Sequence, residues 1–295
     1  METYLIIAGN KGEKESAIHR GIELAKVSGA AVHIVGFAFD TYVSEQTDQQ
    51  IIDNFQLAMI AKRQEYISNT IEKIDIQNVM ITTDVVWEKD ISKWIVDHAK
   101  SDLYSMIIKT GNRSEKFNYT PSDWKIFRES PIPVMIVAKQ KWRQKENVLC
   151  PLNLGLNKDS NHQLNRQIIK QGKVLAKLLN SQLYFCYAIP VPNILIDLDV
   201  VNKKKIVKEK TQKAHLEFAK FADEFGLDPS MLHTKAGEPE KVIPSIANKL
   251  KTRMVVIGTL GRKGIKGKLI GNTAEKVLHH LRTDLLTVSP THDSD

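Results

Sequence analysis

The residues whose types and spacing most clearly suggest a binding site form a basic, glycine-rich segment at 258–271. Its glycines and basic side chains are Gly258, Gly261, Gly264, Gly267 and Gly271, with Arg262, Lys263, Lys266 and Lys268 between them. An apolar run at 255–257 precedes the segment, and a helix start at 272–275 follows it. Glycine lets backbone amides approach an anion closely, and a helix N-terminus adds partial positive charge. The segment therefore predicts an anion site, with Arg262 and Lys263 supplying charge for a phosphate.

The sequence offers no catalytic arrangement beside this segment. The glycine spacing matches neither a P-loop nor the dinucleotide fingerprint. The nine histidines show no paired-ligand spacing, and no Gly-x-Ser-x-Gly elbow or Cys–His pair is present. The nearby acids Glu275 and Asp284 are interpreted as a helix first-turn residue and a strand-edge residue. We therefore expect a binding protein and not a dedicated enzyme.

The rest of the chain alternates strand patterns with helix patterns. In the first half we expect strands at 4–8, 31–38, 79–85, 106–109 and 133–137, and helices at 13–28, 49–73, 90–100 and from 120. In the second half we expect strands at 148–152, 183–188, 231–234, 255–257 and 284–288, and helices at 165–179, 200–225 and 238–250. This alternation predicts an α/β fold with parallel, doubly wound sheets.

The two halves of the sequence are duplicates. Residues 21–26 match residues 172–177 at a separation of 151, and residues 120–122 fall on 271–273 at the same separation. A polar stretch at 139–147 lies between the copies. We therefore expect two tandem domains, at 1–140 and 147–290, each with five strands.

The ends of the first and fourth strands of each domain should lie side by side. Ligands of doubly wound sheets bind beyond the carboxyl ends of the strands, where the strand order reverses. The glycine-rich segment follows strand four, so it should face the turn after strand one if the strand order is 3-2-1-4-5. That turn contains Asn153, which we therefore expect opposite the glycine-rich segment.

With this context, the chain resembles the universal stress protein family over nearly its whole length. The family's nucleotide motif is Gly-x2-Gly-x9-Gly-Ser/Thr, and Gly258, Gly261 and Gly271 have that spacing. Asn272 occupies the hydroxyl position and Thr273 follows it. The chain has two such domains, with residues 117–124 in the first half and residues 271–275 in the second. This arrangement resembles the tandem E-type branch of the family in particular.

The resemblance implies a fold akin to adenine nucleotide alpha hydrolases, with ATP and Mg²⁺ held between strands one and four. Carried over position by position, the implied site comprises Pro151, Asn153, Ala188, Ile257, Gly258, Gly261, Arg262, Lys263, Gly271, Asn272 and Thr273. The three glycines would line ribose and phosphates through their amides, and Asn272 and Thr273 would cap the helix and donate to phosphate. Ala188 and Ile257 would flank the adenine. Asn153 stands where the family has an aspartate, and its amide offers a donor and an acceptor.

The first domain departs from the motif. It has Lys109-Thr110-Gly111-Asn112 where the second has Gly258 to Gly261, and Thr120 where the second has Gly271. Pro121, the next residue, lacks an amide proton. Gly9 and Asn10 follow strand one, so a residual cleft could remain. We expect no nucleotide there and interpret the first domain as a structural partner of the second.

Composition and charge set the remaining expectations. The net charge of +8 comes largely from residues 262–268 and 203–210, without an RNA-binding signature, so we expect no specific nucleic-acid partner. The N-terminus lacks the basic and apolar regions of a signal peptide, and no apolar run reaches about 18 residues. We expect a soluble, cytoplasmic protein. Cys150 and Cys186 should be buried core thiols in a reducing compartment.

Two functional hypotheses remain open at this point, with a third beside them. The first is a stress-response regulator that responds to an adenine nucleotide and acts on protein partners or as a homo-oligomer. The second is an interaction scaffold that works without nucleotide. The third is a cleft that takes another small or apolar ligand beside Ile194, Leu195 and Ile196.

Overall fold

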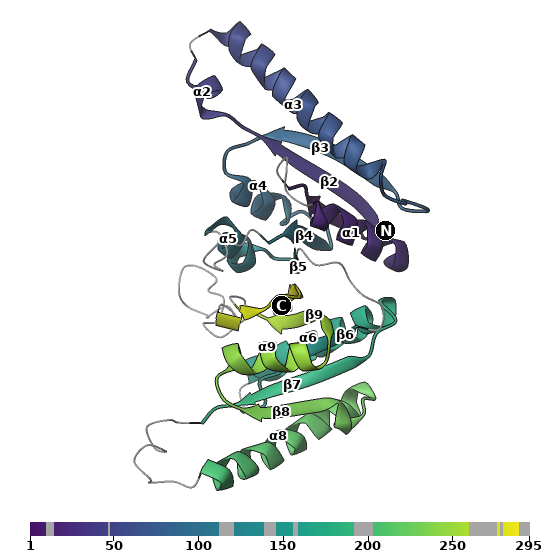
Figure 1. Cartoon of the computed structure of the whole chain (residues 1–295), viewed down its shortest axis with the longest axis vertical. Coiled ribbons are helices and arrows are strands. Elements are labelled where there is room, and N and C mark those ends of the chain that lie inside the picture. The colour runs from purple at the N-terminus through teal and green to yellow at the C-terminus, as the bar shows by residue number, and fades with distance from the viewer. Residues whose placement is uncertain are drawn as a thin grey trace. The chain divides into compact units, whose positions relative to one another are not determined.

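The computed structural model describes residues 1–9, 15–46, 48–111, 121–138, 146–155, 159–191, 203–259, 276–277 and 280–288. The chain divides into two compact units, Met1–Lys139 and Gln140–Asp295. Figure 1 shows the strands and helices of each unit. None of the helices in the described part of the chain is long and apolar enough to cross a membrane.

Unit 1 is a doubly wound parallel sheet. Its strands are β1 (Thr3–Ile7), β2 (Ala31–Ala38), β3 (Ile81–Trp87), β4 (Met106–Thr110) and β5 (Val134–Val137). Its helices are α1 (Ser16–Ser28), α2 (Thr41–Ser44), α3 (Gln49–Ile71), α4 (Ile91–His98) and α5 (Pro121–Glu129). The strands pair in parallel in the order β3-β2-β1-β4-β5. α1 contacts β1, β2 and β4, while α4 packs against α5 (Figure 1).

Unit 2 repeats this plan. Its strands are β6 (Asn147–Pro151), β7 (Leu183–Ile189), β8 (Leu232–Ala236), β9 (Thr252–Gly258) and β10 (Asp284–Val288). Its helices are α6 (Asp159–Leu178), α8 (Lys203–Phe225), the short 3₁₀ helix η1 (Pro229–Met231) and α9 (Pro239–Lys249). The order β8-β7-β6-β9-β10 is again parallel throughout. The predicted doubly wound fold and its strand order are confirmed in both units.

The main errors of the sequence prediction lie at helix starts. α6 begins at Asp159, six residues before the expected start at 165, because the polar residues Asn161 and Asn165 obscure the apolar pattern although both are buried. The short α2 was not predicted. It is one turn capped by Asp40, whose carboxylate accepts from the Val43 amide at 3.1 Å, and so short a helix has no apolar period to detect.

The sequence match between the halves has a packing reason at its glycines. Gly21 of α1 lies against Ile6 of β1, and a Cβ there would clash with the Ile6 side chain. Gly172 of α6 lies in the same way against Cys150 of β6, with Leu183 3.2 Å from the position of a Cβ. In each unit, the first helix therefore approaches the first strand so closely that only glycine fits at the contact.

We expect Gly172→Ala to lower the free energy of unfolding of unit 2 by about 1 to 3 kcal/mol, because the new methyl group overpacks the contact with the Cys150 sulfur. Adding Cys150→Ala removes that sulfur and should restore part of the loss. The measurement is urea denaturation followed by circular dichroism, with hydrogen exchange on α6 to assign the transition. Strictly additive single effects would contradict the proposed contact.

The two cysteines are confirmed as core residues. Cys150 and Cys186 are both free thiols without exposed surface. Burial raises the pKa of each thiol far above its usual value. Both therefore remain protonated and unreactive at neutral pH.

Candidate functional site

The carboxyl edge of the unit 2 sheet brings together the described residues of the predicted site. Pro151 ends β6 and Asn153 follows it, while Ile257 and Gly258 end the neighbouring strand β9. Ala188 lies one residue before the end of β7, which pairs with β6 on its other side. Parallel strands end at the same edge, so these five residues converge on one region.

The other predicted site residues lie outside the described residues. They are Gly261, Arg262, Lys263, Gly271, Asn272 and Thr273. The apolar residues Ile194, Leu195 and Ile196 also fall outside the described part of the chain.

Asn165 fixes the turn that carries Asn153. The amide of Asn153 donates to Asn165 Oδ1 at 3.1 Å, and Asn165 Nδ2 donates to the carbonyl of Asn153 at 3.0 Å. The Asn165 side chain is buried, so these two bonds satisfy it without introducing charge. The Asn153 side chain is exposed, and the one hydrogen bond that it accepts among the described residues is long, 3.4 Å, from the Gly155 amide. Its amide group is therefore presented at the edge of the sheet.

Gly258 is required for packing as well as for its place in the motif. A Cβ at Gly258 would lie within 2.7 Å of three atoms of Leu164, on α6. Leu164 and Asn165 are adjacent, so one turn of α6 both covers the end of β9 and holds the turn after β6. The glycine at the start of the motif thus sets how closely the helix covers this edge.

The sequence prediction missed Tyr187 and Asn165 at this edge. Tyr187 is buried on β7, and its hydroxyl oxygen lies 2.2 Å from the position that a Cβ of Gly155 would take. Burial raises the pKa of Tyr187, so the phenol stays neutral. Its position depends on a contact between distant segments and has no local signal. For Asn165 a weak signal existed: two asparagines, 161 and 165, lie one helical turn apart on the buried face of α6.

The corresponding edge of unit 1 is held by charged side chains. The amide of Gly9, after β1, donates to Glu15 Oε2 at 3.0 Å, and Glu15 is buried. The Arg63 guanidinium, from α3, donates to the carbonyl of Ala8 at 3.2 Å and to that of Gly9. The backbone amide after the first strand therefore donates to a carboxylate in unit 1 and to a neutral asparagine side chain in unit 2.

A buried ion pair lies beside this edge in unit 1. Lys109 Nζ contacts Asp123 Oδ1 at 2.7 Å, and both side chains are buried, Asp123 completely. Lys109 lies opposite Ile136 in β5, and Ile257 lies opposite Thr287 in β10.

This register corrects the sequence comparison, which aligned Lys109 with Gly258. The Gly111 and Thr259 amides donate to the equivalent carbonyls of Val137 and Val288, so Lys109 corresponds to Ile257. The comparison set residues 109–112 against residues 258–261 from sequence alone and was one residue out, because strand pairing decides the register.

We expect Asp123→Asn to lower the free energy of unfolding of unit 1 by about 3 to 5 kcal/mol, because it leaves the buried Lys109 ammonium without its counter-charge. Trp87, Trp94 and Trp124 lie in unit 1, so tryptophan fluorescence during urea denaturation reports the change.

The control for this prediction replaces both partners by apolar residues, Lys109→Met with Asp123→Leu. It should cost much less than Asp123→Asn, because no uncompensated charge remains. A single variant as stable as the parent would show that the pair contributes nothing to unit 1.

Groups of acidic, histidine or cysteine side chains that could hold a metal ion do not occur among the described residues. The five described residues of the unit 2 edge offer amide and backbone groups. This arrangement suits recognition of a neutral, hydrogen-bonding ring beside the sheet, and it presents neither a nucleophile nor a base.

The two units define a tandem protein of doubly wound, Rossmann-like α/β fold. A model of the universal stress protein family matches residues 4–138 and again residues 147–289. The chain therefore belongs to the universal stress protein family and carries two of its domains in tandem.

Relatives with two such domains match almost the whole chain. Universal stress protein E of Escherichia coli K12 is 27% identical, over 98% of this chain and 94% of the relative. The Universal stress protein E homolog of Haemophilus influenzae is 25% identical, over 99% of this chain and 98% of the relative. Both similarities therefore extend across the two domains of this chain.

Solved structures agree on the fold. A functionally unknown protein from Pseudomonas aeruginosa PAO1 matches with a TM-score of 0.71 and 24% identity, covering 98% of this chain and 92% of its own. A universal stress protein from Archaeoglobus fulgidus matches with a TM-score of 0.65 and 14% identity, covering 99% and 97%. At these identities the likeness concerns the fold alone.

Proposed function

We propose that the chain is a cytoplasmic stress-response regulator whose second domain binds an adenine nucleotide, ATP with Mg²⁺, at the carboxyl edge of its sheet. The observation that carries the proposal is the convergence of Asn153 with the end of β9, from which the Gly-x2-Gly-x9-Gly segment begins. The exposed amide of Asn153 would donate to and accept from the adenine. Ala188 and Ile257 would flank the ring.

The residues present fit a nucleotide better than a metal ion alone. The amides of Gly261 and Gly271 would meet the phosphates, Arg262 and Lys263 would supply positive charge, and Asn272 with Thr273 would cap the helix that follows. Mg²⁺ prefers octahedral oxygen ligands and keeps water. It would therefore be held mainly through the phosphate oxygens and not by the amide groups at this edge.

Unit 1 is proposed to act without nucleotide, as the structural partner of unit 2. The carboxylate of Glu15 accepts from the Gly9 amide and would repel a phosphate. Lys109, which corresponds to the adenine-flanking Ile257, is engaged by Asp123. These contacts favour the scaffold hypothesis for the first half of the chain. We propose no catalytic role for either unit beyond slow, incidental ATP hydrolysis.

The direct experiment denatures freshly purified protein and identifies the released small molecules by mass spectrometry. We expect one equivalent of adenine nucleotide per chain, or calorimetric binding of ATP with Mg²⁺ by protein purified without it. Gly261→Val should abolish binding while leaving the fold intact, because the side chain would block the approach of a phosphate to the amide.

The matched control is Thr120→Val, at the position of unit 1 that corresponds to Gly271. It should leave ATP binding unchanged. No released nucleotide together with no heat from ATP and Mg²⁺ at millimolar concentration would overturn the proposal. A Gly261→Val variant that binds ATP as the parent does would show that the site lies elsewhere.

A second test concerns Asn153, which stands where the family has an aspartate. We expect Asn153→Asp to tighten ATP binding by about threefold to tenfold, because a carboxylate accepts a hydrogen bond from the adenine amino group more strongly than an amide. Asn153→Leu should weaken binding. The measurement is calorimetric titration with ATP. Equal affinities for the parent and both variants would show that Asn153 does not contact the nucleotide.

A further inference from the structure

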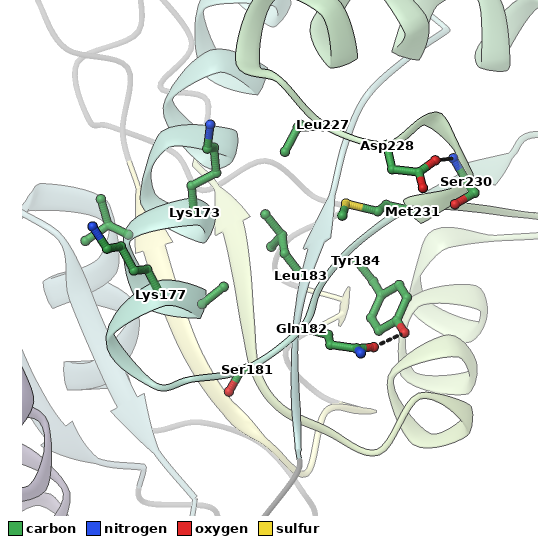
Figure 2. A pocket seen from close by; sticks show the side chains of 12 residues that line it. Lys173, Lys177, Ser181, Gln182, Leu183, Tyr184, Leu227, Asp228, Ser230 and Met231 are labelled. Atoms are coloured by element: carbon green, nitrogen blue, oxygen red, sulfur yellow. Dashed lines mark hydrogen bonds between the residues drawn. The ribbon is translucent and has the colours of Figure 1, made fainter.

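Unit 2 has a cavity at the opposite, amino-terminal edge of its sheet. Its volume is about 740 Å³, which is within the range of small-molecule sites. It lies between the C-terminal half of α6, the start of β7 and η1, the short helix before β8 (Figure 2). None of the five described residues of the predicted nucleotide site lines it.

The cavity combines an apolar floor with a basic wall. Leu183 and Met231 lie at its centre, and Leu227 lies above them in Figure 2. Lys173 and Lys177 lie one turn apart on α6 along one side, and Asp228 lies on the other side. Met231 adapts its shape readily to a ligand. The lining is therefore suited to a molecule with an apolar body and a charged end.

The duplicate position in unit 1 is bridged by an ion pair. Lys26 is the counterpart of Lys177 at the separation of 151 residues, and its Nζ pairs with Asp75 Oδ2 at 2.5 Å. Asp75 makes the same turn as Asp228: each carboxylate accepts from the amide two residues later. In unit 1 an ion pair thus joins the helix to the loop before the third strand.

In unit 2 the described residues include no equivalent ion pair between α6 and the loop before β8. Lys177 makes no ion pair with a described residue. The pKa of Asp228 is lowered by hydrogen bonds from Ser230, and no lysine contributes to that shift. In unit 1, by contrast, the hydrogen bond from Lys26 is the largest cause of the lowered pKa of Asp75.

The neighbouring positions differ between the units as well. Lys173 replaces the fully buried Ile22, and its ammonium donates to the carbonyl of Phe225. Val174, 53% exposed at the cavity, replaces Glu23. Unit 2 has therefore lost a buried apolar side chain and an acid here, and has gained a cation and apolar surface.

We propose that this cavity binds a small amphipathic anion, a medium-chain carboxylate, with its apolar chain on Leu183, Leu227 and Met231 and its carboxylate at Lys177. Burial of each CH₂ group supplies binding free energy. Lys177 supplies a charge-assisted hydrogen bond, since no acid of the described chain competes for it. Val174 replaces the acid that unit 1 has at Glu23, so Asp228 is the one acid among the described lining residues. It lies on the side of the cavity opposite Lys177, and its carboxylate accepts a hydrogen bond from the Ser230 amide.

The test is calorimetric titration of the full chain with decanoate below its micelle concentration. We expect saturable binding of one equivalent. Lys177→Gln and Val174→Glu should each weaken it by about tenfold, the first by removing the charge partner and the second by adding a repelling carboxylate. Val174→Glu introduces the residue that unit 1 has at this position, on an exposed face, so the fold should be retained.

The matched control is Lys26→Gln in unit 1, which should leave decanoate binding unchanged. Decanol, which lacks the charge, should bind more weakly than decanoate and should be insensitive to Lys177→Gln. Saturating ATP should not displace decanoate, because the two sites lie at opposite ends of the strands. Circular dichroism verifies that each variant is folded.

Two results would overturn the proposal. One is the absence of saturable heat with decanoate up to about 1 mM, which corresponds to a binding free energy weaker than about 4 kcal/mol. The other is binding that Lys177→Gln and Val174→Glu both leave unchanged, which would place the carboxylate elsewhere. Neither result bears on the nucleotide site, whose test uses a different ligand and different residues.

Discussion

The close approach of α6 to the sheet is the constraint on which the rest of unit 2 depends. Gly172 lets the helix lie directly on β6, against Cys150, and Gly258 lets Leu164 cover the end of β9. With both contacts made, Asn165 reaches the turn after β6 and holds the backbone of Asn153. One helix thus covers the sheet, orders the turn and leaves the Asn153 side chain exposed at the edge.

The two units solve the same backbone problem with different chemistry. The amide that follows the first strand must be hydrogen-bonded in both. Unit 1 uses the acid Glu15, with the Lys109–Asp123 pair nearby, and unit 2 uses the neutral Asn165. A buried ion pair needs both partners and leaves no charge available for a ligand. The neutral solution keeps unit 2 free of the acid that would repel a phosphate.

The two ends of α6 face two different environments. Its N-terminal half lies at the carboxyl edge of the sheet, where the helix dipole favours an anion. Its C-terminal half forms the wall of the cavity with Lys173 and Lys177. A lysine in the last turn also interacts favourably with the helix dipole, which is reason enough for Lys26 and Lys177 to be present in both duplicates. The two lysines differ in their surroundings: Lys26 pairs with Asp75, whereas Lys177 lines the cavity.

The sequence by itself determined the alternation of strands and helices and the duplication, because hydrophobic periodicity and internal repetition can be read along the chain. The strand order entered as an assumption, and most of the predicted site residues followed from the family resemblance. Only the tertiary structure decided the partners. Asn165 bonds Asn153 across a turn, and strand pairing equates Lys109 with Ile257. Lys26 and Lys177 occupy matched positions in sequence, yet one is paired and the other borders a cavity. Such contacts join segments distant in the chain, and no local pattern encodes them.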